Sequence, residues 1–77
     1  MFEYYTVKES FCAEDAGTYA AYGIGVCEIS PSSRKTLRYI PNVFLDQQRA
    51  EQLAEMCNRL KLDPLHFLDV VQDAVSS

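Results

Sequence analysis

The residues best suited to chemistry lie in the stretch LDPLHFLDVVQDAV, at positions 62–75. It holds the chain's one histidine, His66, and continues with Asp69 and Asp73. On a helix this spacing places the three side chains on one stripe. An imidazole beside carboxylates can act as a general base or bind a divalent cation. The sequence therefore raises the question of a catalytic or metal site here.

The rest of the sequence favours neither kind of site. No nucleophile or oxyanion donor accompanies the stripe, and an exposed helix face does not exclude water. A zinc shell of His66 with Cys12, Cys27 and Cys57 lacks the close ligand pairs typical of structural zinc sites. We expect no catalytic residue, no metal and no cofactor, and we expect that the chain is not an enzyme. The three cysteines are expected to be free thiols in a reducing compartment.

The charge of the chain disfavours nucleic-acid binding. The 77 residues carry a net charge of −4, whereas phosphate contacts require a basic surface. The spacing of the last two helices resembles that of a helix-turn-helix. The chemistry does not fit this motif, because the stripe has no lysine or arginine with which to contact bases. The one basic cluster is Arg34, Lys35 and Arg38. A nucleic-acid-associated regulator is therefore the weaker alternative, and we expect no nucleic-acid partner.

The sequence also lacks the features of a membrane or exported protein. No apolar run approaches the roughly 20 residues that span a bilayer. The first residues, MFEYYTVKES, have no basic segment followed by an apolar one, as a signal peptide would. We expect a cytoplasmic protein with no membrane partner.

The first half of the chain has the pattern of strands. Aromatic and β-branched residues predict strands at about 2–8, 19–30 and 34–41, with a loop between the first two. Small residues share one face of the second strand, with Gly23 and Gly25 at its centre. Such a face indicates that a helix or a second chain approaches the backbone closely.

Proline marks the end of the third strand. Pro41 cannot donate a hydrogen bond to a neighbouring strand, and Asn42 follows it. We expect these two residues either to end the sheet or to force a bulge.

Two helices are predicted in the second half, at about 46–61 and 64–75. Asp46 and Asp63 are suited to be their N-caps, and Pro64 suits the first helical position. The first helix is expected to bury a stripe of Ala50, Leu53, Met56, Cys57 and Leu60. The second is expected to bury a broader one of Phe67, Leu68, Val70, Val71, Ala74 and Val75.

These elements predict one α+β domain over residues 1–77. We expect a three-stranded antiparallel sheet followed by a helical hairpin on one face, in the order βββαα. The short connection between the helices brings their ends together. We expect Asn58, Asp63 and His66 to form a hydrogen-bonded polar corner there, with a structural role.

The chain resembles a small bacterial protein family of unknown function. The resemblance covers about residues 20–75 and rests on a Tyr-Gly-Ile strand at 22–24 and a helix that ends in Cys-Asn at 57–58. It continues with the pattern Leu-x-Pro-x-His-x-Leu-Asp-Val-Val-x-Asp at 62–73. It implies a stand-alone cytoplasmic bacterial protein and no assigned activity.

Protein binding is the function that these residues favour. Asp69 and Asp73 are like charges one helical turn apart, and a basic partner surface would compensate them. We therefore interpret His66, Asp69 and Asp73 as an interaction face of a small acidic interaction or adaptor module. The expected partner is an unidentified protein or a second copy of the chain, bound through this face or an exposed sheet edge. A metal-binding or enzymatic domain is the more distant alternative.

Overall fold

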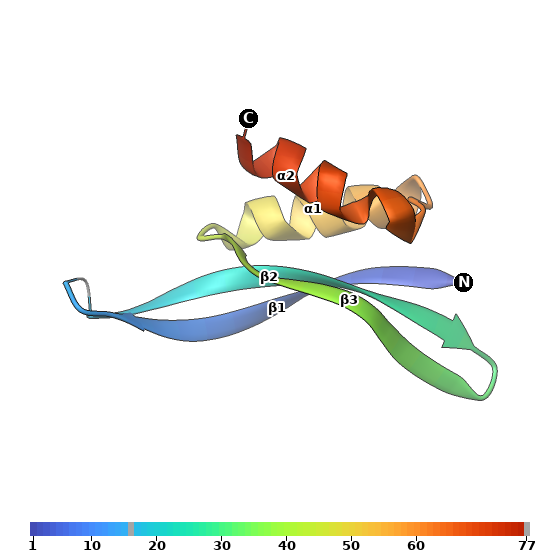
Figure 1. Ribbon diagram of the computed structural model, residues 1–77, viewed down its shortest axis with the longest axis horizontal. Helices are drawn as coiled ribbons and strands as arrows, with labels where there is room; N and C mark the ends of the chain where they lie inside the picture. Colours follow the sequence, from blue (N-terminus) through green and yellow to red (C-terminus); the bar gives the residue numbers. More distant parts are fainter. Residues whose placement is uncertain (16, 77) are drawn as a thin grey trace.

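The computed structural model describes residues 1–15 and 17–76, and its three strands form one antiparallel sheet in the order β1-β2-β3. The elements are β1 (Phe2–Ala13), β2 (Gly17–Ser30), β3 (Ser33–Phe44), α1 (Gln47–Arg59), the 3-10 turn η1 (Pro64–His66) and α2 (Phe67–Ser76). Both helices lie on the same face of the sheet (Figure 1). The predicted α+β fold in the order βββαα is confirmed.

The hairpin of β1 and β2 is longer than predicted. β1 continues to Ala13, well past the expected end near residue 8. Near the tip, Phe11 pairs with Tyr19, and their rings stack with centroids 5.6 Å apart. This pairing extends the ladder into the segment that was expected to be a loop. Ala16, which belongs to that segment, lies outside the described residues. The hairpin projects beyond the helices (Figure 1).

β3 contains a bulge at the predicted place. Tyr22 pairs with Phe44, whereas Ile24 pairs with Ile40, so β3 has extra residues between these two pairs. They include Pro41 and Asn42, and the φ of Asn42 is +54°. Of the two expected outcomes, the bulge is the correct one, because pairing resumes after the proline.

The core lies between the helices and the sheet. Its buried residues are Tyr4, Tyr22, Ile24, Val26, Phe44, Ala50, Leu53, Ala54, Cys57, Phe67 and Val71. Asp46 caps α1 by accepting from the Gln48 N–H at 2.9 Å, as predicted. Leu60, expected in the core, is 65% exposed because it follows the last turn of α1 as its C-cap.

The buried stripe of α2 is narrower than predicted. Phe67 and Val71 are buried, but Leu68 is 39% exposed and Val75 is 52% exposed. α2 is the outermost element, so no further layer covers its far side (Figure 1). Leu68 and Val75 instead line a shallow groove against the bulge of β3.

The small-residue face of β2 is covered by tyrosines of its neighbours. Gly25 lies on the face away from the helices, since Ile24 and Val26 enter the core. A Cβ atom at Gly25 would lie 2.5 Å from Cζ of Tyr5, and one at Gly23 would lie 2.6 Å from Cζ of Tyr39. The expected close approach is therefore real, but tyrosines of β1 and β3 make it, and the helices lie on the other face.

Candidate interaction site at the edge of the sheet

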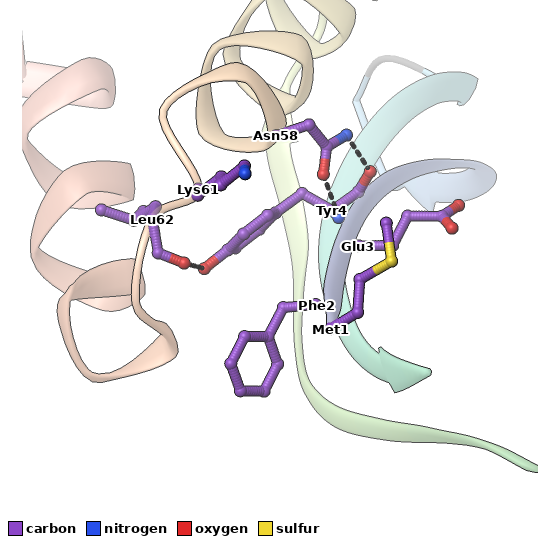
Figure 2. Close-up of a pocket in the computed structure, with 7 residues that line it drawn as sticks. All are labelled: Met1, Phe2, Glu3, Tyr4, Asn58, Lys61 and Leu62. Atoms are coloured by element: carbon purple, nitrogen blue, oxygen red, sulfur yellow. Dashed lines mark hydrogen bonds between the residues drawn. The ribbon is translucent and has the colours of Figure 1, made fainter. Parts of the chain in front are cut away.

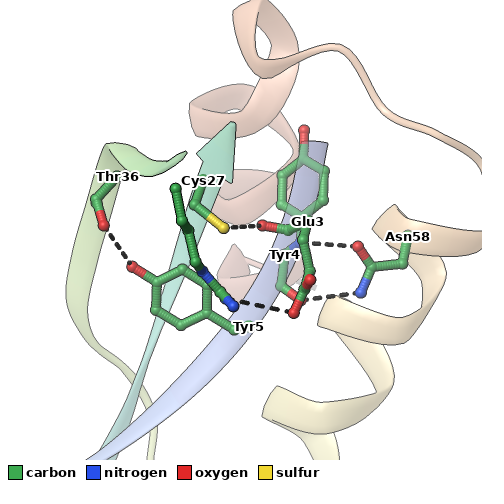
Figure 3. A network of polar contacts seen from close by, with 7 residues as sticks. Glu3, Tyr4, Tyr5, Cys27, Thr36 and Asn58 are labelled. Carbon is green, nitrogen blue, oxygen red and sulfur yellow. Dashed lines mark hydrogen bonds and ion pairs between the residues drawn. The ribbon is translucent and has the colours of Figure 1, made fainter. Parts of the chain in front are cut away.

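The side chain of Asn58 takes the place of a neighbouring strand at β1. The Tyr4 N–H donates to Oδ1 of Asn58 at 2.7 Å, and Nδ2 of Asn58 donates to the Tyr4 carbonyl at 2.9 Å (Figures 2 and 3). An adjacent strand would satisfy the same two backbone groups. The last turn of α1 therefore closes the outer edge of β1 at this one residue.

Beyond Tyr4 the outer edge of β1 is open. Backbone groups alternate in direction along a strand, so the outward direction of Tyr4 is shared by every second residue. The Ile29 N–H donates to the Met1 carbonyl at 2.7 Å, which confirms that odd positions face β2. No hydrogen bond from another described residue reaches the outward backbone groups further along the strand. We call these groups the open edge; they belong to Thr6, Lys8, Ser10 and Cys12.

The other edge of the sheet is less regular. The bulge in β3 interrupts its ladder at Pro41, which has no N–H to offer. A second register shift falls between Val26 and Cys27 of β2, where Leu37 is the extra residue of β3. Bulges and proline are devices that protect a sheet edge from pairing. β1 therefore offers the more regular surface for an added strand.

A pocket of about 480 Å³ lies beside Asn58, between the start of β1 and the end of α1 (Figure 2). Its lining is mainly apolar and consists of Met1, Phe2, Glu3, Tyr4, Asn58, Lys61 and Leu62. The Tyr4 hydroxyl donates to the Leu62 carbonyl at 2.6 Å. Burial, and then the nearby Cys57 and Asp63, raise the pKa of Tyr4 to about 12, so the hydroxyl remains a donor at neutral pH.

The face of the sheet away from the helices is held by its own side chains (Figure 3). Arg34 of β3 reaches across β2 to the Glu3 carboxylate at 3.4 Å, and it lies 5.9 Å from the Tyr5 ring centroid. The Tyr5 hydroxyl lies 3.4 Å from Oγ1 of Thr36. These contacts join the two outer strands over the glycines of β2, so this face has internal partners.

One family of proteins matches the whole chain. Its model is described as a family of unknown function, DUF6514, and it matches residues 1–77. The chain belongs to the DUF6514 family. No curated protein and no solved structure matches it. The expected membership of a family of unknown function is confirmed. The matched residues extend beyond those on which the resemblance rested.

In this DUF6514 chain the predicted interaction face is exposed. His66 ends η1, and Asp69 and Asp73 follow on the outer side of α2. Their side chains make no hydrogen bond or ion pair with the residues that the structure describes. The three residues thus share a solvated stripe, and their role as an interaction face stays a prediction.

The predicted polar corner is divided between two separate sets of contacts. Asp63 caps η1, accepting from the Leu65 N–H at 3.0 Å through its side chain and from the His66 N–H at 2.9 Å through its carbonyl. Asn58 instead bonds to Tyr4. Within the described chain, no hydrogen bond joins the side chains of Asn58, Asp63 and His66. The structural role of Asn58 is therefore to connect α1 with β1.

The three cysteines of the DUF6514 chain are free thiols. Cys27 and Cys57 are buried and Cys12 is exposed. Burial raises the pKa of the Cys57 thiol, which keeps it protonated. Among the described residues, no group of three or more His, Cys, Asp or Glu side chains could hold a metal ion. No described helix is long and apolar enough to cross a membrane.

Sequence reasoning named an exposed sheet edge but none of its residues. The open edge of this DUF6514 chain has no motif of its own, and its residues are recognised only once strand order and strand direction are known. The nearest signal in the sequence is Asn58, a polar residue at the end of an amphipathic helix and next to buried Cys57.

Proposed function

We propose that this DUF6514 chain is a protein-interaction module that binds an extended segment of a partner along the open edge of β1. The observation that carries the proposal is the pair of hydrogen bonds between Asn58 and Tyr4. They satisfy the outward backbone groups of one residue, and no described residue bonds to those of the next four. Addition of a strand to such an edge is a recurring mode of peptide recognition, in which main-chain hydrogen bonds supply the affinity.

The length of β1 supports this function. β1 has 12 residues, whereas strands typically have about 5 or 6. Long, regular edges promote aggregation, and proteins usually shorten, bend or cover them. Here the protection is confined to Tyr4 at one end and to the single charge of Lys8 along the open edge. An edge left regular over most of its length suits a partner strand.

The proposal places the module in the cytoplasm of a bacterium and assigns it no catalytic step. The three free thiols support a reducing compartment, and the bacterial source follows from the resemblance described above. The stripe of His66, Asp69 and Asp73 remains available for a second contact on the other side of the molecule.

Substitution of Ser10 by proline tests the function. Proline at this position removes an N–H that points away from β2, so the ladder inside the sheet keeps its hydrogen bonds. We expect crosslinked partners captured from the native host by the wild type to be lost with Ser10→Pro and retained with Ser10→Ala. Circular dichroism and thermal unfolding establish that both variants are folded. Equal capture by the two variants would exclude strand addition at this edge.

A further inference from the structure

Two acidic side chains of α1, Glu51 and Glu55, lie on the exposed side of the helix near the Thr6 and Lys8 end of the open edge. Asn58 identifies the flank of α1 that faces this edge, because its carboxamide reaches the backbone of β1. At 3.6 residues per turn, Glu51 lies about 20° and Glu55 about 60° from Asn58 around the helix axis. Both residues are exposed, and neither forms an ion pair with a described residue. Glu51 also accepts from Nε2 of Gln47 at 2.9 Å, which holds its side chain along the flank.

The strand itself adds little positive charge. Lys8 is the one cation of β1. Glu9 lies beside it on the opposite face of the sheet and accepts from the Tyr39 hydroxyl. On the helix side, the acids Glu51 and Glu55 therefore outnumber Lys8 near the middle of the open edge, whereas the cations Arg59 and Lys61 lie toward its pocket end.

We propose that the segment bound at the open edge is basic and places lysine or arginine side chains on the helix side, against Glu51 and Glu55. It runs antiparallel to β1, because antiparallel pairing is slightly more stable per residue than parallel pairing. This inference rests on the proposed function and names the chemistry of its partner. Complementary charge around a main-chain ladder supplies specificity and speeds association, since a ladder alone accepts many sequences.

A second copy of the chain fits the edge poorly. An antiparallel pair that used all four residues of the open edge would place Thr6 opposite Cys12 and Lys8 opposite Ser10 of the other copy. The same register sets Glu9 opposite Glu9, and like charges directly opposite are unfavourable. It also brings the two α1 flanks, each with Glu51, toward the same seam. With a net charge of −4 on each copy, the edge favours a basic partner over itself.

The pocket extends the binding surface in one direction. A segment antiparallel to β1 runs from Cys12 toward Thr6 and then meets Asn58, which prevents pairing at Tyr4. Its following residues reach the mainly apolar pocket lined by Met1, Phe2 and Leu62. The segment is therefore expected to carry apolar residues after its basic stretch.

Titration with designed peptides tests the inference. The probe is a fluorescent peptide of about ten residues, a typical upper length for a strand, in which lysine alternates with threonine or valine and two leucines follow. A matched peptide has glutamate in place of each lysine. The protein variants are Glu51→Lys and the control Glu28→Lys, which changes an exposed acid of the central strand β2. The two variants change the net charge equally, but only the first lies beside the open edge.

We expect the wild type to bind the basic peptide and not the acidic one. Reversal at Glu51 should weaken binding by about fivefold or more, whereas reversal at Glu28 should leave it nearly unchanged. Equal effects of the two reversals, or equal binding of the two peptides, would overturn the inference.

Its failure is distinguishable from failure of the proposed function. If the basic peptide does not bind while Ser10→Pro still abolishes capture of the host partner, the edge is used and its partner is not basic. If Ser10→Pro leaves capture unchanged, the function itself is wrong.

Discussion

The carboxamide of Asn58 bonds to both backbone groups of Tyr4, with the Tyr4 N–H at 2.7 Å from Oδ1 and the Tyr4 carbonyl at 2.9 Å from Nδ2. A helix thus completes the edge of a sheet at one residue. The pair connects the first strand with the end of α1 and marks the beginning of the open edge.

Asn58→Ala should destabilise the fold. It removes both hydrogen bonds and leaves the Tyr4 backbone groups to water in a partly buried site, at a cost of about 1–3 kcal/mol. Urea unfolding followed by circular dichroism measures this loss. Arg59→Ala, in the same turn and exposed, is the matched control and should change stability by less than about 0.5 kcal/mol. Equal effects of the two substitutions would show that the carboxamide contributes nothing specific.

Tyr4→Phe should cost about 1 kcal/mol, the usual worth of one hydrogen bond. It removes the hydroxyl that donates to the Leu62 carbonyl at 2.6 Å. The ring keeps its packing against Phe67, whose centroid lies 5.3 Å away. Chemical unfolding again gives the difference. A larger loss, of about 3 kcal/mol or more, would point to collapse of the ring packing.

Alkaline pH should destabilise the protein through two tyrosines. Burial raises the pKa of both Tyr4 and Tyr39 to about 12, and at Tyr39 the hydrogen bond with Glu9 adds to this effect. A pKa raised on folding gives stability that is complete below pH 10, the unfolded value, and is lost as pH rises toward 12. Unfolding at a series of pH values should therefore show a decline above pH 10 that is shallower in Tyr4→Phe and in Tyr39→Phe. An unchanged slope in both variants would contradict the assignment.

Gly25→Ala should destabilise the sheet by about 1–3 kcal/mol, the usual cost of overpacking. The new methyl group would lie 2.5 Å from Cζ of Tyr5, so the ring must move. Tyr5→Ala in the same chain removes the obstruction. In a double-mutant cycle the two substitutions should cost less together than the sum of their separate effects. Simple additivity would mean that the ring does not restrict this position.

The sequence predicts the elements of the fold better than the contacts between them. The structure confirms the predictions that rest on local signals. These are the strand and helix periods, the caps Asp46 and Asp63, and the bulge at Pro41. Asn58 and Tyr4 are 54 residues apart, and their pairing depends on the position of α1 over β1. Which tyrosines lie over Gly23 and Gly25 depends on strand register. The open edge depends on which strand is outermost, and composition does not determine that.

The connection of Tyr4 to the second half of the chain has a consequence for folding. Its three long-range hydrogen bonds, two with Asn58 and one with Leu62, join residues 54 and 58 positions apart, so they require closure of most of the chain. Such contacts form slowly compared with a hairpin. During synthesis β1 emerges before α1 does, and the outer groups of Tyr4 have no partner until Asn58 has been added and α1 has docked. The nascent sheet therefore passes through a stage in which the whole outer side of β1 is exposed to other chains.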